Sequence, residues 1–153
     1  MWPLLLLAGA VLLVRSRDSG EEGDDEVAGT VDPSVGAIWL EPFWWASTTA
    51  RQQGIDNTPS PEAIANLLLL RDSLNTTFPG GYSVTNAYRS QALNVALRAR
   101  GYAAAEHSLH LEGRAADLVP LGLSLDEAAA RARASGRFVE VITYNDGHLR
   151  VAV

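Results

Sequence analysis

The stretch S108-L-H-L-E-G-R-A-A-D-L118 contains two side chains that can bind a metal, His110 and Asp117. They are seven positions apart, and side chains on a straight strand alternate between its faces, so the two cannot share one face of such a strand. Gly113 lies between them and supplies the turn, because glycine adopts backbone conformations that other residues rarely reach. After this turn, Asp117 is expected on a new strand, facing back towards His110.

The C-terminal residues predict a β-hairpin. Residues 138–144 and 148–153 have β-like patterns and are separated by Asn-Asp-Gly, a strong signal for a tight turn. His148 and Arg150 share a face of the second strand, and the hairpin can bring that face near Asp117. Two histidines and one carboxylate form a ligand set that suits zinc and leaves a fourth position open for water.

Helix and strand signals alternate over the rest of the chain. Helices are expected at residues 41–54, 60–75, 90–100 and 124–135, and further strands at residues 82–87 and 115–119. Ser60 is expected to cap the second helix, and Ser124 with Glu127 forms a capping box at the start of the fourth. These elements predict an α+β domain in which helices pack on a small, largely antiparallel sheet.

The chain divides into three regions by composition. Residues 1–15 form an anchor or docking segment whose residues 2–14 are apolar, residues 16–36 read as an acidic flexible linker, and residues 37–153 are expected to form one domain. A helix of residues 2–14 is ~20 Å long, which is short of the ~30 Å hydrocarbon core of a membrane. We expect this segment to contact either a membrane or a partner protein, and a cleaved signal is less favoured.

Charge and cysteine content exclude several classes of site. Residues 16–32 hold one arginine and seven acidic residues, which account for the whole net charge of -6. The remainder is near neutral and has no basic patch, so we expect no nucleic-acid partner. The chain has no cysteine, so any metal must be held by imidazole and carboxylate groups.

Residues 108–117 fit the pattern S-x-H-x-x-G-x-A-x-D at every fixed position, and this resembles the signature of the M15 zinc peptidases. That family includes D-Ala-D-Ala carboxypeptidases and phage endopeptidases that act on peptidoglycan. The segment VTNAYRSQALN, residues 84–94, is similar to the family's strand-turn-helix segment ending in Y-R-S. GIDNTPSPEAIANLLLL, residues 54–70, is similar to the G-I-x-N-x-P stretch of its phage-type branch. The resemblance covers about residues 40–153 and implies an M15 peptidase-like fold.

The resemblance also implies roles for individual residues. His110 and Asp117 match two zinc ligands, and Arg89 matches an arginine that pairs with a substrate carboxylate. Guanidinium groups suit this task because they bind carboxylates through two hydrogen bonds. Ser108 matches a serine near the substrate, which can also orient the loop by hydrogen bonding.

The third zinc ligand is where the sequence departs from the family pattern. The family's last strand has a histidine just before a valine, and here the strand reads G147-H-L-R-V-A-V153, so Arg150 stands at the ligand position. Arginine stays protonated and has no lone pair to donate. Three alternatives remain open: His148 becomes the third ligand, Arg150 replaces the metal and pairs with Asp117, or a metal binds weakly to His110 and Asp117 alone.

A general base is expected near the hairpin. Some branches of the family place a carboxylate a few residues before the last histidine, and Asp146 in the turn is the candidate, although Asp-Gly also favours hairpins regardless of chemistry. Glu140, the other local carboxylate, is expected to face solvent.

The resemblance implies a zinc peptidase that hydrolyses amide bonds of peptidoglycan stem peptides or cross-bridges. The apolar N-terminus and acidic linker favour a protein tethered to a cell envelope or a virus particle. The alternative is a domain that has lost catalysis and serves as a structural or wall-binding component of a virion.

Overall fold

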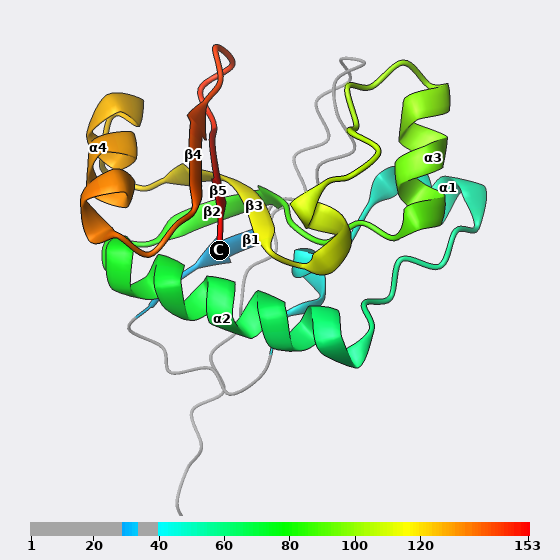
Figure 1. The fold of residues 1–153 in the computed structure, drawn as a ribbon, viewed down its shortest axis with the longest axis horizontal. Helices are drawn as coiled ribbons and strands as arrows, with labels where there is room; N and C mark the ends of the chain where they lie inside the picture. The colour runs from blue at the N-terminus through cyan, green and yellow to red at the C-terminus, as the bar shows by residue number, and fades with distance from the viewer. Residues whose placement is uncertain (1–28, 34–39) are drawn as a thin grey trace, which may run out of the picture.

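Five antiparallel strands form a single sheet in the computed structural model, which describes residues 29–33 and 40–153 (Figure 1). The strands are β1 (Gly29–Val31), β2 (Tyr82–Asn86), β3 (Ala115–Pro120), β4 (Glu140–Thr143) and β5 (Leu149–Ala152). Their order across the sheet is β1-β2-β3-β5-β4, and β4 and β5 pair as the hairpin that the Asn-Asp-Gly turn predicted. The expected α+β fold with an antiparallel sheet is confirmed.

Serine residues begin all four α-helices of the described chain. The helices are α1 (Thr48–Gln53), α2 (Pro61–Thr77), α3 (Gln91–Ala99) and α4 (Leu125–Ser135). The side chains of Ser47, Ser60, Ser90 and Ser124 accept hydrogen bonds from backbone N–H groups of the first turns, and the predicted capping box of α4 is present.

The helix predicted over residues 41–54 is two shorter helices. A 3-10 helix, η1 (Pro42–Trp44), is followed by α1, and between them Ser47 has an extended backbone conformation with φ -147° and ψ 131°. Ser47 caps α1, so its side chain starts a new helix in place of continuing the first.

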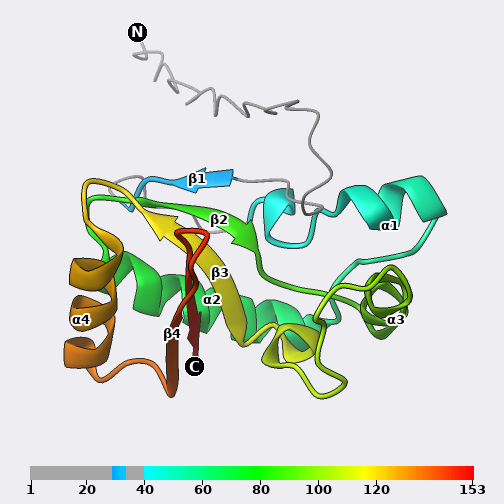
Figure 2. The ribbon, with the colours of Figure 1, turned by 90° about the horizontal axis from the view of Figure 1, so that it is seen from above.

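The main core lies between one face of the sheet and the helices α2 and α4. Tyr82, Val84, Leu118, Leu149 and Val151 from the strands are fully buried there, as are Leu67, Leu70 and Leu74 of α2. Figure 2 shows α2 running along that face of the sheet, with α4 at one end. A smaller apolar cluster joins α1 and α3 at the other end. The opposite face of β3 and β5 is thereby left for polar residues.

β1 is a correction to the predicted linker of residues 16–36. Residues 29–31 pair with β2, and Val31 is buried in the main core. Gly29 lies directly against the ring of Phe43, where a Cβ atom would come within 2.2 Å of the ring. This short strand is stabilised by tertiary packing that the acidic composition does not reveal.

The N-terminal apolar segment and residues 16–28 lie outside the described residues. Among the residues that the structure does describe, no helix combines the length and apolar character needed to cross a membrane.

Candidate active site

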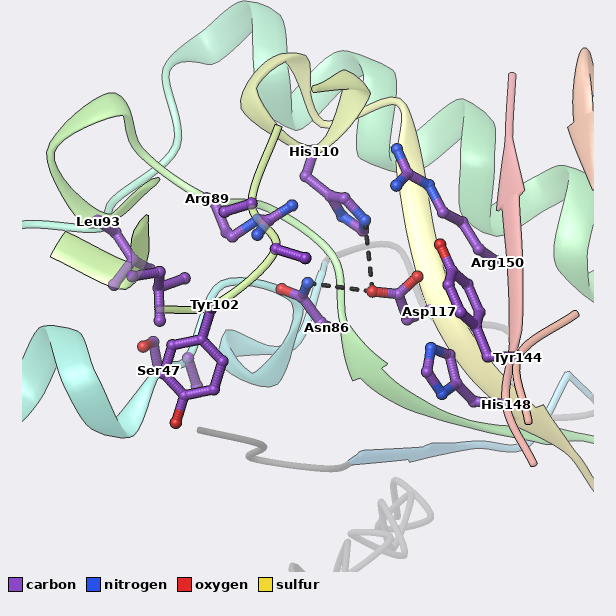
Figure 3. A pocket seen from close by; sticks show the side chains of 14 residues that line it. Ser47, Asn86, Arg89, Leu93, Tyr102, His110, Asp117, Tyr144, His148 and Arg150 are labelled. Carbon is purple, nitrogen blue, oxygen red and sulfur yellow. Dashed lines mark hydrogen bonds and ion pairs between the residues drawn. The ribbon is translucent and has the colours of Figure 1, made fainter. Parts of the chain in front are cut away.

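A cavity of about 260 Å³ opens on the polar face of the sheet, between the β4–β5 hairpin and the segments around α1 and α3 (Figure 3). Its polar wall includes Asn86, Arg89, His110, Asp117, Tyr144, His148 and Arg150. Its apolar wall includes Leu93, Leu97 and Tyr102. The cavity therefore joins most of the predicted site residues to a surface that can receive apolar parts of a ligand.

The turn between His110 and Asp117 has the form that the sequence predicted. Ser108 caps a 3-10 helix, η2 (Leu109–Glu112), which carries His110, and Gly113 ends it with a left-handed φ of 70°. β3 then begins at Ala115 and carries Asp117. The chain turns back at Gly113, so the side chains of His110 and Asp117 meet although His110 lies in η2 and Asp117 in β3.

His110 and Asp117 face each other through atoms that both carry lone pairs. Nδ1 of His110 donates to the carbonyl oxygen of Ala87, so in the neutral ring the lone pair is on Nε2. Nε2 is buried, makes no hydrogen bond and lies 3.4 Å from Oδ2 of Asp117. Such a pair of acceptors requires a cation, which is either a proton on the imidazole or a metal ion.

Asp117 is an ionised carboxylate held by its neighbours. Burial raises its pKa, but the imidazole of His110 beside it, the hydrogen bond from the amide of Asn86 and the charge of His148 lower the pKa below the ordinary value. Asn86 Nδ2 donates to Oδ2 at 3.2 Å, whereas Oδ1 is buried without a hydrogen bond. Oδ1 of this ionised carboxylate therefore lacks a hydrogen-bond donor in the structure.

Arg89 lies in the same cavity, as its predicted role requires. Its Nη2 donates to Oγ of Ser108 at 3.3 Å, and its Nε is buried without a hydrogen bond. Ser108 is buried and does not line the cavity. Its position supports the second role expected from the sequence, in which Ser108 orients its neighbours by hydrogen bonding. It accepts a hydrogen bond from Arg89 and caps the 3-10 helix that carries His110.

Arg150 does not pair with Asp117, so that alternative is wrong. The two residues are directly opposite each other in the β3–β5 register, but Nε of Arg150 lies 2.9 Å from Oε1 of Glu140. The contact is an ion pair that lacks the geometry of a hydrogen bond. Glu140 was expected to face solvent, and this is also wrong, since it shares the face of Arg150 on the adjacent strand and neutralises part of its charge.

His148 lies on the cavity wall, and two residues of its own hairpin contact its ring. Its Nδ1 contacts the carboxylate of Asp146, and its ring stacks on Tyr144 with centroids 4.4 Å apart. Asp146 is largely exposed and does not line the cavity, so it reaches the site only through His148. A histidine whose Nδ1 is held by a carboxylate presents Nε2 outward, which is the usual arrangement of a metal-binding imidazole.

The residues fit zinc at two positions. Ligands that share a tetrahedral zinc ion at 2.0–2.1 Å stand about 3.4 Å apart, and the buried Nε2 of His110 and Oδ2 of Asp117 have this separation. Among the described residues, no three His, Asp or Glu side chains lie close enough together to hold a metal ion. His148 lines the same cavity but stands apart from the first two.

Two further residues of the site were not predicted. Asn86 orients Asp117, and Tyr144 supports His148. Asn86 lies in the segment 84–94 whose family resemblance was recognised, but its side-chain contact depends on the irregular β2–β3 register between Val84 and Asn86. Tyr144 directly follows β4, the first strand of the hairpin, where an aromatic residue carries no distinctive signal.

Comparison with known proteins supports the family assignment. The family described as Peptidase M15 matches residues 44–151, which is most of the chain. Among solved structures, the chain is similar to the L-Ala D-Glu endopeptidase ChiX of Serratia marcescens, with 21% identity and a TM-score of 0.40. The match covers 62% of this chain and 89% of that one. No curated protein sequence matches. On the family match and the motif around His110, the chain belongs to the M15 peptidase family.

Proposed function

We propose that this protein is a zinc-dependent peptidase that hydrolyses amide bonds in the stem peptides or cross-bridges of peptidoglycan. The observation that carries the proposal is the buried Nε2 of His110, which has no hydrogen bond and faces Asp117 at 3.4 Å. A buried pair of this kind is costly unless a cation binds it. Family membership provides the second support.

His110, Asp117 and His148 are the residues that would hold zinc in this proposal. His148 is the third donor because its Nε2 makes no hydrogen bond among the described residues and its ring lines the same cavity. When bound, zinc supplies an acidified water and polarises a carbonyl group. Asp146 acts as a positioning residue, since it contacts His148 and not the cavity.

The other residues bind and orient the peptide. Arg89 is placed to grip a carboxylate of the peptide, and Ser108 keeps its guanidinium in position. Asn86 holds Asp117 ionised and correctly turned. A peptide bound in this way meets the His110–Asp117 pair with its charged end already fixed, which lowers the entropic cost of reaction.

We further propose that the protein works while tethered, at a cell envelope or in a virus particle. The support is in the sequence: an apolar run at residues 2–14 followed by an acidic stretch rich in glycine and serine. A partner protein or a membrane would bind the apolar run, and the acidic stretch would give the peptidase reach.

Hydrolysis is tested with the full-length, zinc-supplemented protein and purified peptidoglycan. We expect new amino groups and shortened peptides, detected by amine labelling and mass spectrometry, and a loss of at least about 100-fold in His110→Ala. His107→Ala is the matched control, because His107 is an exposed histidine three residues away that does not line the cavity. Equal release by wild type and His110→Ala would contradict the proposal.

A second candidate function is binding of peptidoglycan without hydrolysis. The observation that favours it is the Arg150–Glu140 ion pair at the position where the resemblance expects the third ligand, because a fixed guanidinium opposes a nearby dication. In that case the protein would sediment with peptidoglycan, and the same assay would detect no released amines with zinc present.

A further inference from the structure

Two arginines enter the cavity from different parts of the fold. Arg89 follows β2 and Arg150 lies on β5, and both line the cavity on either side of Asp117 (Figure 3). Arg89, Arg150 and Asp117 are the only Arg, Lys, Asp or Glu residues among the described residues that line the cavity. The two arginines outnumber the one carboxylate on the wall itself, and Glu140, which does not line the cavity, offsets part of the charge of Arg150.

Both guanidinium groups keep donors that the protein does not use. Arg89 lines the cavity, and its Nη2 donates to Ser108, whereas its Nη1 makes no hydrogen bond to the described residues. Nε of Arg150 forms an ion pair with Glu140, which orients the side chain. The two terminal nitrogens of Arg150 make no hydrogen bond to the described residues. Charged donors left without partners in a cavity are costly, and anionic ligands satisfy them.

The two guanidinium groups also act on each other. Burial lowers the pKa of Arg89, Asp117 raises it, and the charge of Arg150 lowers it again. An arginine remains protonated in spite of such shifts, so the two guanidinium groups repel each other. Anions placed against each of them relieve it.

One carboxylate is poorly suited to contact both arginines. Arg150 is directly opposite Asp117 on β3, and Asp117 is opposite Asn86 on β2, with Arg89 three residues further on. Neighbouring strands are ~4.8 Å apart, so two strand spacings separate the backbone of Arg150 from β2. A single ligand carboxylate placed between the two guanidinium groups would lie beside the carboxylate of Asp117, and the two negative charges would repel each other.

We propose that the cavity selects peptides with two carboxylates, one bound by Arg89 and the other by Arg150. The inference rests on the proposed function, because it names the substrate class of the same site. In this proposal Arg150, which stands where the family pattern has a metal-binding histidine, is a second anion-binding group. Its ion pair with Glu140 orients it. The apolar wall of Leu93, Leu97 and Tyr102 remains for the uncharged part of the peptide.

The test measures binding and needs no hydrolysis. The full-length protein, freed of metal with a chelator, is titrated calorimetrically with N-acetyl-alanyl-D-glutamate and with its two monoamides. We expect the diacid to bind about tenfold or more tightly than either monoamide, as the loss of one charge-assisted contact predicts. Arg150→Gln should weaken the diacid and one monoamide by a similar factor and leave the other monoamide unchanged. That unchanged ligand also shows that the variant is folded.

Arg98→Gln is the matched control, because Arg98 does not line the cavity and, within the described part of the chain, makes an exposed 4.0 Å ion pair with Glu106 and no other side-chain hydrogen bond or ion pair. Its affinities should equal those of wild type. Equal binding of all three ligands by wild type, no binding of any of them, or an Arg150→Gln variant with unchanged affinity for the diacid would overturn the inference. Binding that depends on Arg150 in a protein without hydrolytic activity would support the inference and contradict the proposed hydrolysis, so the two failures are distinguishable.

Discussion

Replacing Arg150 by histidine should raise the affinity of the protein for zinc by about 100-fold, because the change removes a positive charge and adds an imidazole donor. Position 150 is opposite Asp117 in the β3–β5 register, on the face that lines the cavity. An imidazole there joins His110 and Asp117, the two residues that already face each other at 3.4 Å. Competition with a chromophoric chelator measures the affinity.

Arg150→Gln separates the two contributions to this gain. It removes the same positive charge but adds no imidazole, so we expect an increase of only about tenfold. If the histidine variant binds zinc no more tightly than the glutamine variant, the side chain at position 150 does not reach the metal, and the resemblance fails at this position.

Gly113→Ala should lower the free energy of unfolding by about 3 kcal/mol, since the new side chain adds both backbone strain and a clash. Gly113 has a φ of 70°, and a Cβ atom there would lie 2.5 Å from the carbonyl oxygen of Ala63 and 3.1 Å from Cγ of Leu67. Both neighbours belong to α2, whose packing against η2 sets the position of His110. Urea denaturation measures the loss.

Gly136→Ala is the matched control for the clash. Gly136 has a φ of 64°, but no atom lies within 4 Å of a Cβ atom placed on it. Only backbone strain remains, so the expected loss is about 1 kcal/mol. Equal losses in the two variants would show that the close packing of Gly113 on α2 does not contribute to stability.

The features of this fold that the sequence predicts are those that depend on residues close together in the chain. Ser60, Ser90 and Ser124 begin helices because their side chains bind backbone N–H groups nearby in the chain, so each can be recognised without tertiary information. The Asn-Asp-Gly turn and the motif around Gly113 are equally local. They place His110 and Asp117 together before any packing is known.

The unpredicted features depend on contacts between distant segments. β1 forms because Val31 is buried in a core made by other elements. Arg150 pairs with Glu140 because the hairpin register places them on one face, and the sequence alone did not indicate which carboxylate would neutralise the arginine. The exposed position of Asp146, which contacts His148, likewise follows from the shape of the turn.

Zinc content tests the central claim most directly. The full-length protein is dialysed exhaustively and analysed for metal, beside His110→Ala, His148→Ala and the control His107→Ala. We predict close to one zinc per chain in wild type and in the control, and a large loss in the other two variants, because His110 and His148 are proposed ligands on one cavity. Wild-type protein without zinc, or zinc that His110→Ala retains, would contradict the account.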